Sequence, residues 1–101
     1  MHVLLIDASY WFDFRALGHD ESAVQLEAYE THLDDILKTL PAPPDCIIQQ
    51  EYLGSRHFLT GLENAPCPTF FLAFDAHLNL HWHRYYSRLF DAVLTPHVSL
   101  F

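Results

Sequence analysis

The 101-residue sequence predicts an α/β fold, a small three-layer α/β/α domain of the Rossmann-like or flavodoxin-like kind. Short, continuously apolar segments, typical of parallel strands covered on both faces, alternate with segments of helical periodicity. Half of the residues are hydrophobic, so one domain of this length can bury a core. We therefore expect residues 1–101 to form a single domain around a parallel sheet of about four or five strands.

Five apolar segments are expected to form the strands. Segment 22–26 fits either a short strand or the first turns of the next helix, and the turn-like Gly18-His19-Asp20 before it favours the strand. Right-handed crossovers between parallel strands then give the strand order 2-1-3-4-5. The five expected strands are residues 3–6, 22–26, 46–49, 70–74 and 91–94.

Four helices are expected between and after these strands. The first is short and ends at Gly18, because glycine readily adopts the left-handed conformation that closes a helix. The second carries apolar residues at helical spacing, with Thr31 as its expected N-cap and Asp34–Lys38 as an ion pair on its outer face. The four expected helices are residues 10–17, 29–40, 55–63 and 78–89.

The last of these helices has two faces of different character. Apolar residues at spacings of four, three and four predict a stripe buried against the sheet: Leu78, Trp82, Tyr85 and Leu89. A polar, partly cationic stripe opposite it would suit an anionic group, although a solvated helix face explains it more simply. The members of this second stripe are His77, His81, Arg84 and Arg88.

Charge and cysteine usage exclude several classes of function. The formal net charge of −8 argues against nucleic acid and against an anionic membrane surface, since both need basic groups. Cys46 and Cys67 lack the spacing of a metal finger, and two free thiols suit the reducing cytoplasm, where we expect the protein to be located. The N-terminal apolar run is too short for a signal peptide, and no segment is long enough to span a membrane.

The candidate site lies at the carboxyl edge of the sheet, the edge where parallel strands end and where open α/β sheets bind ligands. Three expected strands end there in polar residues, in segments 7–9, 50–51 and 75–77. Ser9 and Glu51 are therefore candidate substrate-binding residues. Asp75 and His77 form a candidate acid–base pair, in which the carboxylate orients the imidazole. Equally, Asp75 could cap the helix that follows.

A metal site at the same corner is disfavoured by geometry. Asp75, His77, His81 and His83 are metal-ligand types, but His83 lies about 200° around a helix from His81. Exposed or helix-capping histidines explain these residues better, so no metal is expected.

The segments PPDCIIQQEYLGSRHFLTGLE, at residues 43–63, and PCPTFFLAFDAHLNLHWHRYYSRLFDAVLT, at residues 66–95, resemble the N-terminal half of bacterial glycosyltransferases of the spore-maturation (CgeB-like) type. The shared pattern includes Cys-Pro-Thr, a strand ending in Asp-x-His, an aromatic helix and Leu-Phe-Asp. The turn ALGHD, at residues 16–20, is similar to a turn before the second strand of such domains.

The resemblance implies a two-domain GT-B architecture. In that architecture the N-terminal Rossmann-like domain mostly binds the sugar acceptor, a C-terminal domain binds the nucleotide sugar, and no metal is obligatory. By position, Asp75, His77 and Asn79 would line the acceptor side of the cleft, with Glu51 nearby. His81 is a further candidate substrate-binding residue. The chain ends where the second domain should begin, so we expect it to be inactive alone. The implied partners are that C-terminal domain and an acceptor that is a protein, a glycan or a small molecule.

Parts of the sequence also match three other functions. A non-catalytic interaction or oligomerisation module would use an aromatic surface to dock a partner or form a homodimer. A cobalamin domain would explain Asp75-x-His77, but Leu80 stands where its DxHxxG motif needs glycine. A phosphoacceptor receiver domain is disfavoured because the only lysine, Lys38, precedes Asp75.

Overall fold

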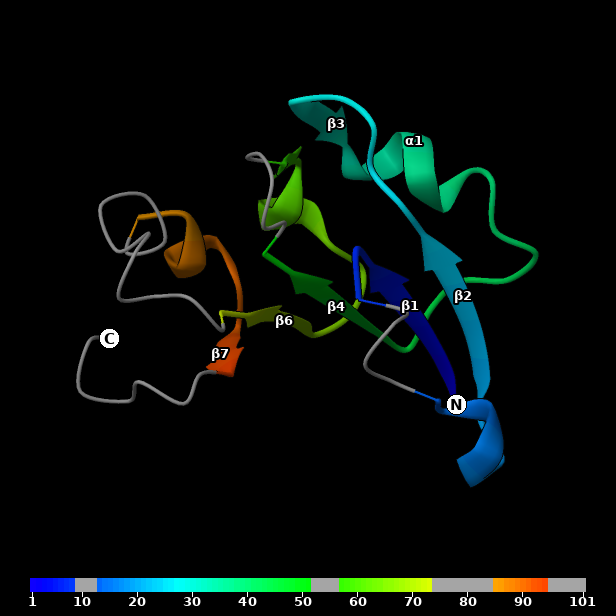
Figure 1. Cartoon of the computed structure of the whole chain (residues 1–101). Helices are drawn as coiled ribbons and strands as arrows, with labels where there is room; N and C mark the ends of the chain where they lie inside the picture. The colour runs from blue at the N-terminus through cyan, green and yellow to red at the C-terminus, as the bar shows by residue number, and fades with distance from the viewer. Residues whose placement is uncertain (9–12, 52–56, 74–84, 95–101) are drawn as a thin grey trace.

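The computed structural model describes residues 1–8, 13–51, 57–73 and 85–94, and the main feature of this part of the chain is a five-stranded parallel sheet (Figure 1). All four pairings between neighbouring strands are parallel, which confirms an α/β-type fold. The strands of this main sheet are β1 (His2–Ile6), β2 (Asp20–Val24), β4 (Cys46–Gln50), β6 (Thr69–Leu72) and β7 (Ala92–Leu94).

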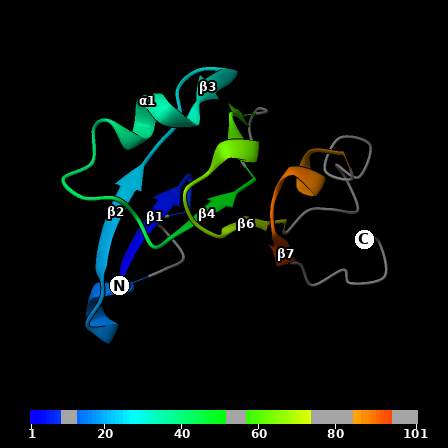
Figure 2. The same ribbon diagram turned by 180° about the vertical axis from the view of Figure 1, so that it is seen from behind.

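The strands lie in the order β2-β1-β4-β6-β7. This order differs from the expected 2-1-3-4-5, because the described part of the chain forms seven strands and not five. The two additional strands, β3 (Glu30–His32) and β5 (Phe58–Thr60), pair in a separate two-stranded parallel sheet. Counted among themselves, the strands of the main sheet run second, first, third, fourth, fifth. The small sheet was not expected from the sequence. Its strand β3 lies with α1 at the end of the main sheet where β1 and β2 finish (Figures 1 and 2).

Within the described residues, the helical segments are shorter than expected. They are the α-helix α1 (Leu33–Leu37), two α-helical residues at 85–86, and the 3₁₀ helices η1 (Arg15–Leu17), η2 (Leu62–Asn64) and η3 (Ser87–Leu89). Gly18 does end η1 in the left-handed conformation, with φ at 85°. No helix in the described part of the chain is long and apolar enough to cross a membrane.

The N-terminus of α1 differs from the expectation. Thr31 lies in β3, and His32 is the N-cap, whose Nδ1 accepts a hydrogen bond of 3.1 Å from the backbone N–H of Asp34. Lys38 lies 3.9 Å from Asp35 rather than pairing with Asp34. Both partners of that pair are exposed, so the pair adds little stability.

The expected helix at 55–63 is wrong, because residues 58–60 form β5 and residues 62–64 form η2. The reason is a tertiary pairing: β5 pairs with β3, and Leu59 is buried in the core. Apolar residues in a short window do not reveal a partner strand almost 30 residues away in the sequence.

The expected buried stripe in 78–89 is also wrong where it can be assessed. Tyr85 and Leu89 are 63% and 50% exposed, whereas Tyr86 and Phe90 are buried against Phe71. The buried aromatic residues thus lie one position later than predicted. Leu78 and Trp82 lie outside the described residues.

The sheet buries apolar side chains on both faces. The first face, which includes Leu4, Ile6, Ile47 and Phe71, is covered by the connections from β2 to β4, from β4 to β6 and from β6 to β7. These connections contribute buried side chains to the same cluster: Leu26, Leu33, Ile36, Leu59, Leu62, Tyr86 and Phe90.

The second face includes Val3, Leu5 and Ile48, and Phe14 from the β1–β2 connection packs against it. Of the described residues outside the sheet, Phe14 and Ala8 contribute to this second cluster. The connections leaving β1 and β4 therefore cover opposite faces. This places the topological switch point of the sheet between β1 and β4.

Gly61 supports the turn between β5 and η2, and its replacement tests this turn. Gly61→Ala should lower the free energy of unfolding by clearly more than Gly18→Ala, although both glycines have φ near 85°. Left-handed backbone costs alanine about 1 kcal/mol or more at either position. Only at Gly61 would the new Cβ also lie 2.7 Å from the His32 ring, whereas nothing lies within 4 Å at Gly18. Urea denaturation of both variants measures the difference, and equal losses would contradict the close contact.

Candidate functional site at the carboxyl edge

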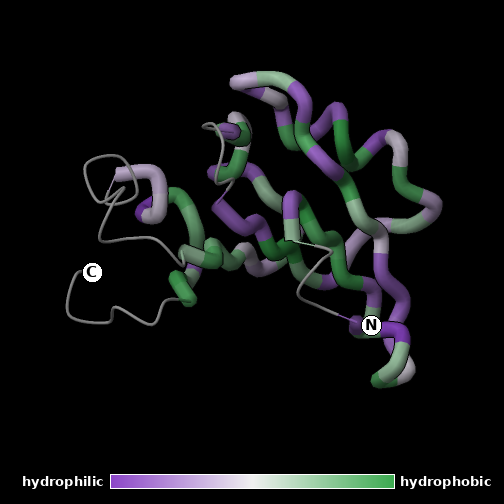
Figure 3. The backbone as a smooth tube through the Cα atoms, viewed as in Figure 1, coloured by the Kyte–Doolittle hydropathy of each residue, from purple (hydrophilic) through white to green (hydrophobic). Residues whose placement is uncertain are grey.

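The switch point brings together the residues that follow β1 and β4. Ile6 and Gln49 are register partners. The residues that follow them, Asp7 after β1 and Gln50 on β4, therefore lie side by side. Figure 3 shows β1 as a largely hydrophobic strand, and the sequence places His2 at its start and Asp7 directly after it. In open α/β sheets this position forms the usual ligand crevice.

Asp7 is held in an unusual backbone conformation. Its φ of 56° is left-handed, which an aspartate tolerates better than most residues. Its N–H donates to the Val24 carbonyl at 2.9 Å, and its Oδ1 accepts the Leu26 N–H at 2.9 Å. The side chain of Asp7 therefore fixes the chain as it leaves β2.

The second carboxylate oxygen of Asp7 binds His57. Asp7 Oδ2 lies 3.0 Å from His57 Nδ1, and the two side chains are 0% and 8% exposed. Because a carboxylate can only accept, the proton of this hydrogen bond lies on Nδ1. The contact fixes the ring orientation of His57 and connects the end of β1 to the start of β5.

A second part of the buried network extends from His57 to Tyr86. Gln49 Nε2 donates to the His57 carbonyl at 3.1 Å, and the Tyr86 hydroxyl donates to Gln49 Oε1. The same hydroxyl accepts the Leu59 N–H at 2.8 Å. Burial raises the pKa of the Tyr86 hydroxyl well above its ordinary value, so it remains a donor at neutral pH.

Gln50 differs from Gln49 although the two residues are adjacent. Successive strand side chains point to opposite faces, so Gln50 lies on the second face of the sheet. It is 6% exposed, and its Oε1 is buried with no hydrogen-bond partner among the described residues. An unsatisfied buried acceptor costs about 1–3 kcal/mol, so its presence at the carboxyl edge requires an explanation.

Glu51 is the one predicted site residue that lies within the described residues. It is buried directly after β4, and its N–H donates to the Leu72 carbonyl at 3.0 Å. This places Glu51 at the carboxyl end of β4, where its backbone is hydrogen-bonded to the end of β6. The other five predicted site residues lie outside the described residues: Ser9, Asp75, His77, Asn79 and His81.

The described residues offer neither a metal centre nor a reactive thiol. No group of three or more potential metal ligands occurs among them. Cys46 and Cys67 are free, and burial is the main cause that raises the pKa of both thiols, to about 11 for Cys67. A raised pKa keeps the thiol protonated at neutral pH, which makes it a poor nucleophile.

The sequence did not reveal the side chains that bind Asp7. His57 lies in the segment for which the sequence predicts a helix, and the sequence predicts Gln49 only as a strand residue. Asp7 itself had a usable signal, because a single acid directly after an apolar strand is typical of a strand-end site. Its partner, 50 residues away, has no comparable signal in the sequence.

No protein-family model, curated protein or solved structure matches the chain. A function is therefore inferred from the arrangement of side chains at the carboxyl edge, together with the resemblance of the sequence segments.

The Asp7–His57 pair should be needed for stability. Asp7→Ala should lower the free energy of unfolding by about 3 kcal/mol, because it leaves the buried Leu26 N–H and the His57 ring without their acceptor. Asp7→Asn should cost about 1 kcal/mol, since asparagine keeps one acceptor and tolerates the left-handed backbone. Urea denaturation measures both, with the exposed Asp34→Ala as control. A loss for Asp7→Ala no larger than that of the control would refute this role.

Proposed function

We propose that this chain is the acceptor-side domain of a GT-B glycosyltransferase, and that a second domain supplies the nucleotide sugar. The five parallel strands and their switch point support this proposal, because this topology has a ligand crevice at its carboxyl edge. In the proposed protein the domain has the three-layer Rossmann-like arrangement and acts in the cytoplasm.

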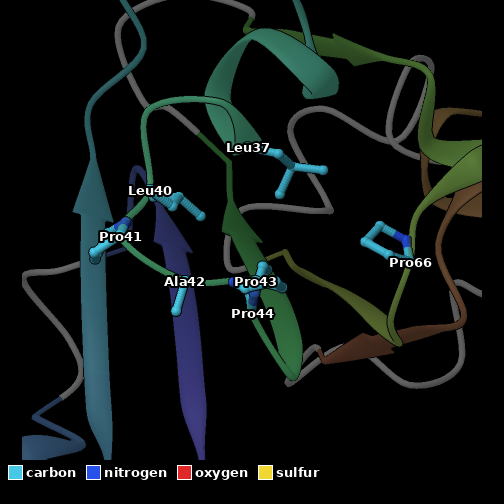
Figure 4. Close-up of a pocket in the computed structure, with 7 residues that line it drawn as sticks. All are labelled: Leu37, Leu40, Pro41, Ala42, Pro43, Pro44 and Pro66. Carbon is cyan, nitrogen blue, oxygen red and sulfur yellow. The ribbon is translucent and has the colours of Figure 1, made fainter.

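The observation that carries the proposal is the gathering of buried polar side chains at the switch point. Asp7 and His57 fix the backbone there, and Gln50 offers an acceptor that no described residue uses. A different cavity of about 430 Å³ lies where β4 and β6 begin, and its lining is almost wholly apolar (Figure 4). It is lined by Leu37, Leu40, Pro41, Ala42, Pro43, Pro44 and Pro66. Such a lining is less suited to a hydroxyl-rich acceptor than the carboxyl edge.

In the proposed reaction an acceptor hydroxyl attacks the anomeric carbon of the nucleotide sugar, and the nucleoside diphosphate leaves. Asp75 or His77 acts as the base that takes the hydroxyl proton as the new bond forms. Ser9, Glu51, Asn79 and His81 contact the acceptor and hold the hydroxyl in line. No metal is needed for these roles.

The proposal predicts a defined kinetic effect. When the chain is joined to its nucleotide-sugar-binding domain, Asp75→Asn and His77→Ala should be compared with the wild type in a sugar-transfer assay. Loss of the general base should lower kcat about 100-fold or more in at least one of these variants. The KM for the nucleotide sugar should change little, because the other domain binds it.

Lys38→Ala is the matched control, since Lys38 is exposed on the far side of α1's buried residues. It should leave kcat unchanged. Unchanged transfer in both Asp75→Asn and His77→Ala would refute their role, and absence of any transfer by the joined protein would refute the proposed function.

A second candidate function is an interaction module, and one observation favours it. Tyr85, Leu89 and Leu94 are large, exposed apolar residues near β7, which is the edge strand of the described sheet. Such a surface can be covered by a partner domain or a second copy of the chain. Gel filtration with multi-angle light scattering distinguishes these cases: a dimer that Leu94→Asp dissociates supports the module, whereas a monomer at all concentrations opposes self-association.

A further inference from the structure

Among the described residues, Gln50 has a buried polar side chain that hydrogen bonding within the protein does not explain. The two glutamines at the end of β4 provide an internal comparison. The Gln49 amide is satisfied at both ends, by the His57 carbonyl and the Tyr86 hydroxyl. Gln50 is nearly as buried, yet its Oε1 has no partner. An apolar residue at this position would make the fold more stable, because replacing an unsatisfied buried acceptor loses no hydrogen bond.

The location of Gln50 makes it suitable for binding. In register it lies between Asp7 on β1 and Leu72 on β6, at the end of the central strand and beside the switch point. The terminal torsion of a glutamine has a broad energy profile, so the amide can turn towards a ligand without moving the backbone of β4. The strand itself is held by pairing on both sides.

The chemistry of the amide restricts the ligand. Oε1 accepts a hydrogen bond and the adjacent NH₂ donates, so a glutamine offers one acceptor and one donor side by side. Two neighbouring hydroxyl groups on a ligand match this pair, one donating and the other accepting. A phosphate group at neutral pH carries between one and two negative charges, and its unprotonated oxygens can only accept hydrogen bonds. Its charge would also come near two acidic residues, because Asp7 follows the neighbouring strand β1 and Glu51 directly follows Gln50.

We infer that Gln50 is a specificity-determining residue that binds a vicinal diol of a neutral, hydroxyl-rich ligand at the carboxyl edge and selects against phosphorylated ligands. This inference rests on the proposed function for the identity of the ligand as a sugar acceptor. It adds the residue that recognises the acceptor and the chemical class that it selects.

The test uses the 101-residue chain and its Gln50→Met and Gln49→Met variants, because methionine keeps the length of the side chain and removes the amide. The probes are methyl α-glucoside, α-mannoside and α-galactoside, and inorganic phosphate. Binding is followed by the NMR shift of the Gln50 side-chain amide and of backbone amides in β1 and β4. Tm is measured for all three proteins.

At least one glycoside should bind the wild-type chain more tightly than phosphate does, and Gln50→Met should weaken that binding at least tenfold. Tm of Gln50→Met should equal or exceed that of the wild type, whereas Gln49→Met should lower Tm because two buried partners lose their bonds. The inference is overturned if no glycoside binds the wild type, if phosphate binds as tightly, if Gln50→Met retains the affinity, or if it lowers Tm as much as Gln49→Met does.

The same variants separate this inference from the proposed function. Sugar transfer by the joined protein with an unchanged acceptor KM in Gln50→Met would overturn the inference alone. Glycoside binding through Gln50 in a joined protein that transfers no sugar would overturn the proposed function alone.

Discussion

The buried contact between Asp7 and His57 is the constraint on which the candidate site depends. One carboxylate binds the segment after β2 through Leu26 and the segment before β5 through His57, while its own backbone leaves β1 in a left-handed conformation. Three segments distant in sequence thus meet at one side chain. A polar group so deeply buried is tolerated because its bonds are satisfied. The shape of the carboxyl edge follows from this contact.

The network beyond His57 explains why the first face of the sheet carries both polar and aromatic residues. Tyr86 packs its ring against Phe58, Phe71 and Phe90, and directs its hydroxyl to Gln49 and Leu59. The hydroxyl thereby accepts the hydrogen bond of the Leu59 N–H, on the side of β5 that does not pair with β3. Packing and hydrogen bonding here support the same arrangement, which is the condition for one well-defined structure.

The sequence predicted the strands better than the helices, for a physical reason. Segments 3–6 and 70–74 are continuous apolar runs, and segment 46–49 is apolar up to Gln49. Each overlaps an observed strand, because burial on both faces leaves a local signal. The helix expected at 55–63 failed because β5 exists through its pairing with the distant β3. The same holds for the candidate site. The sequence indicates Asp7 and Glu51 as acids at strand ends, whereas no sequence pattern predicts the contact that gives His57 its role.

The contrast between Gln49 and Gln50 shows how one strand end can serve stability and binding at once. The alternation of a β-strand sends the two identical side chains to opposite faces, so neighbouring residues experience different requirements. On the first face, Gln49 completes a satisfied network that holds the edge in place. On the second face, the unpartnered Oε1 of Gln50 is a cost to folding that a ligand with hydroxyl groups would remove. In the inferred role of Gln50, the rigidity that Gln49 supplies would allow discrimination between ligands, since an acceptor on a fixed strand selects by geometry as well as by chemistry.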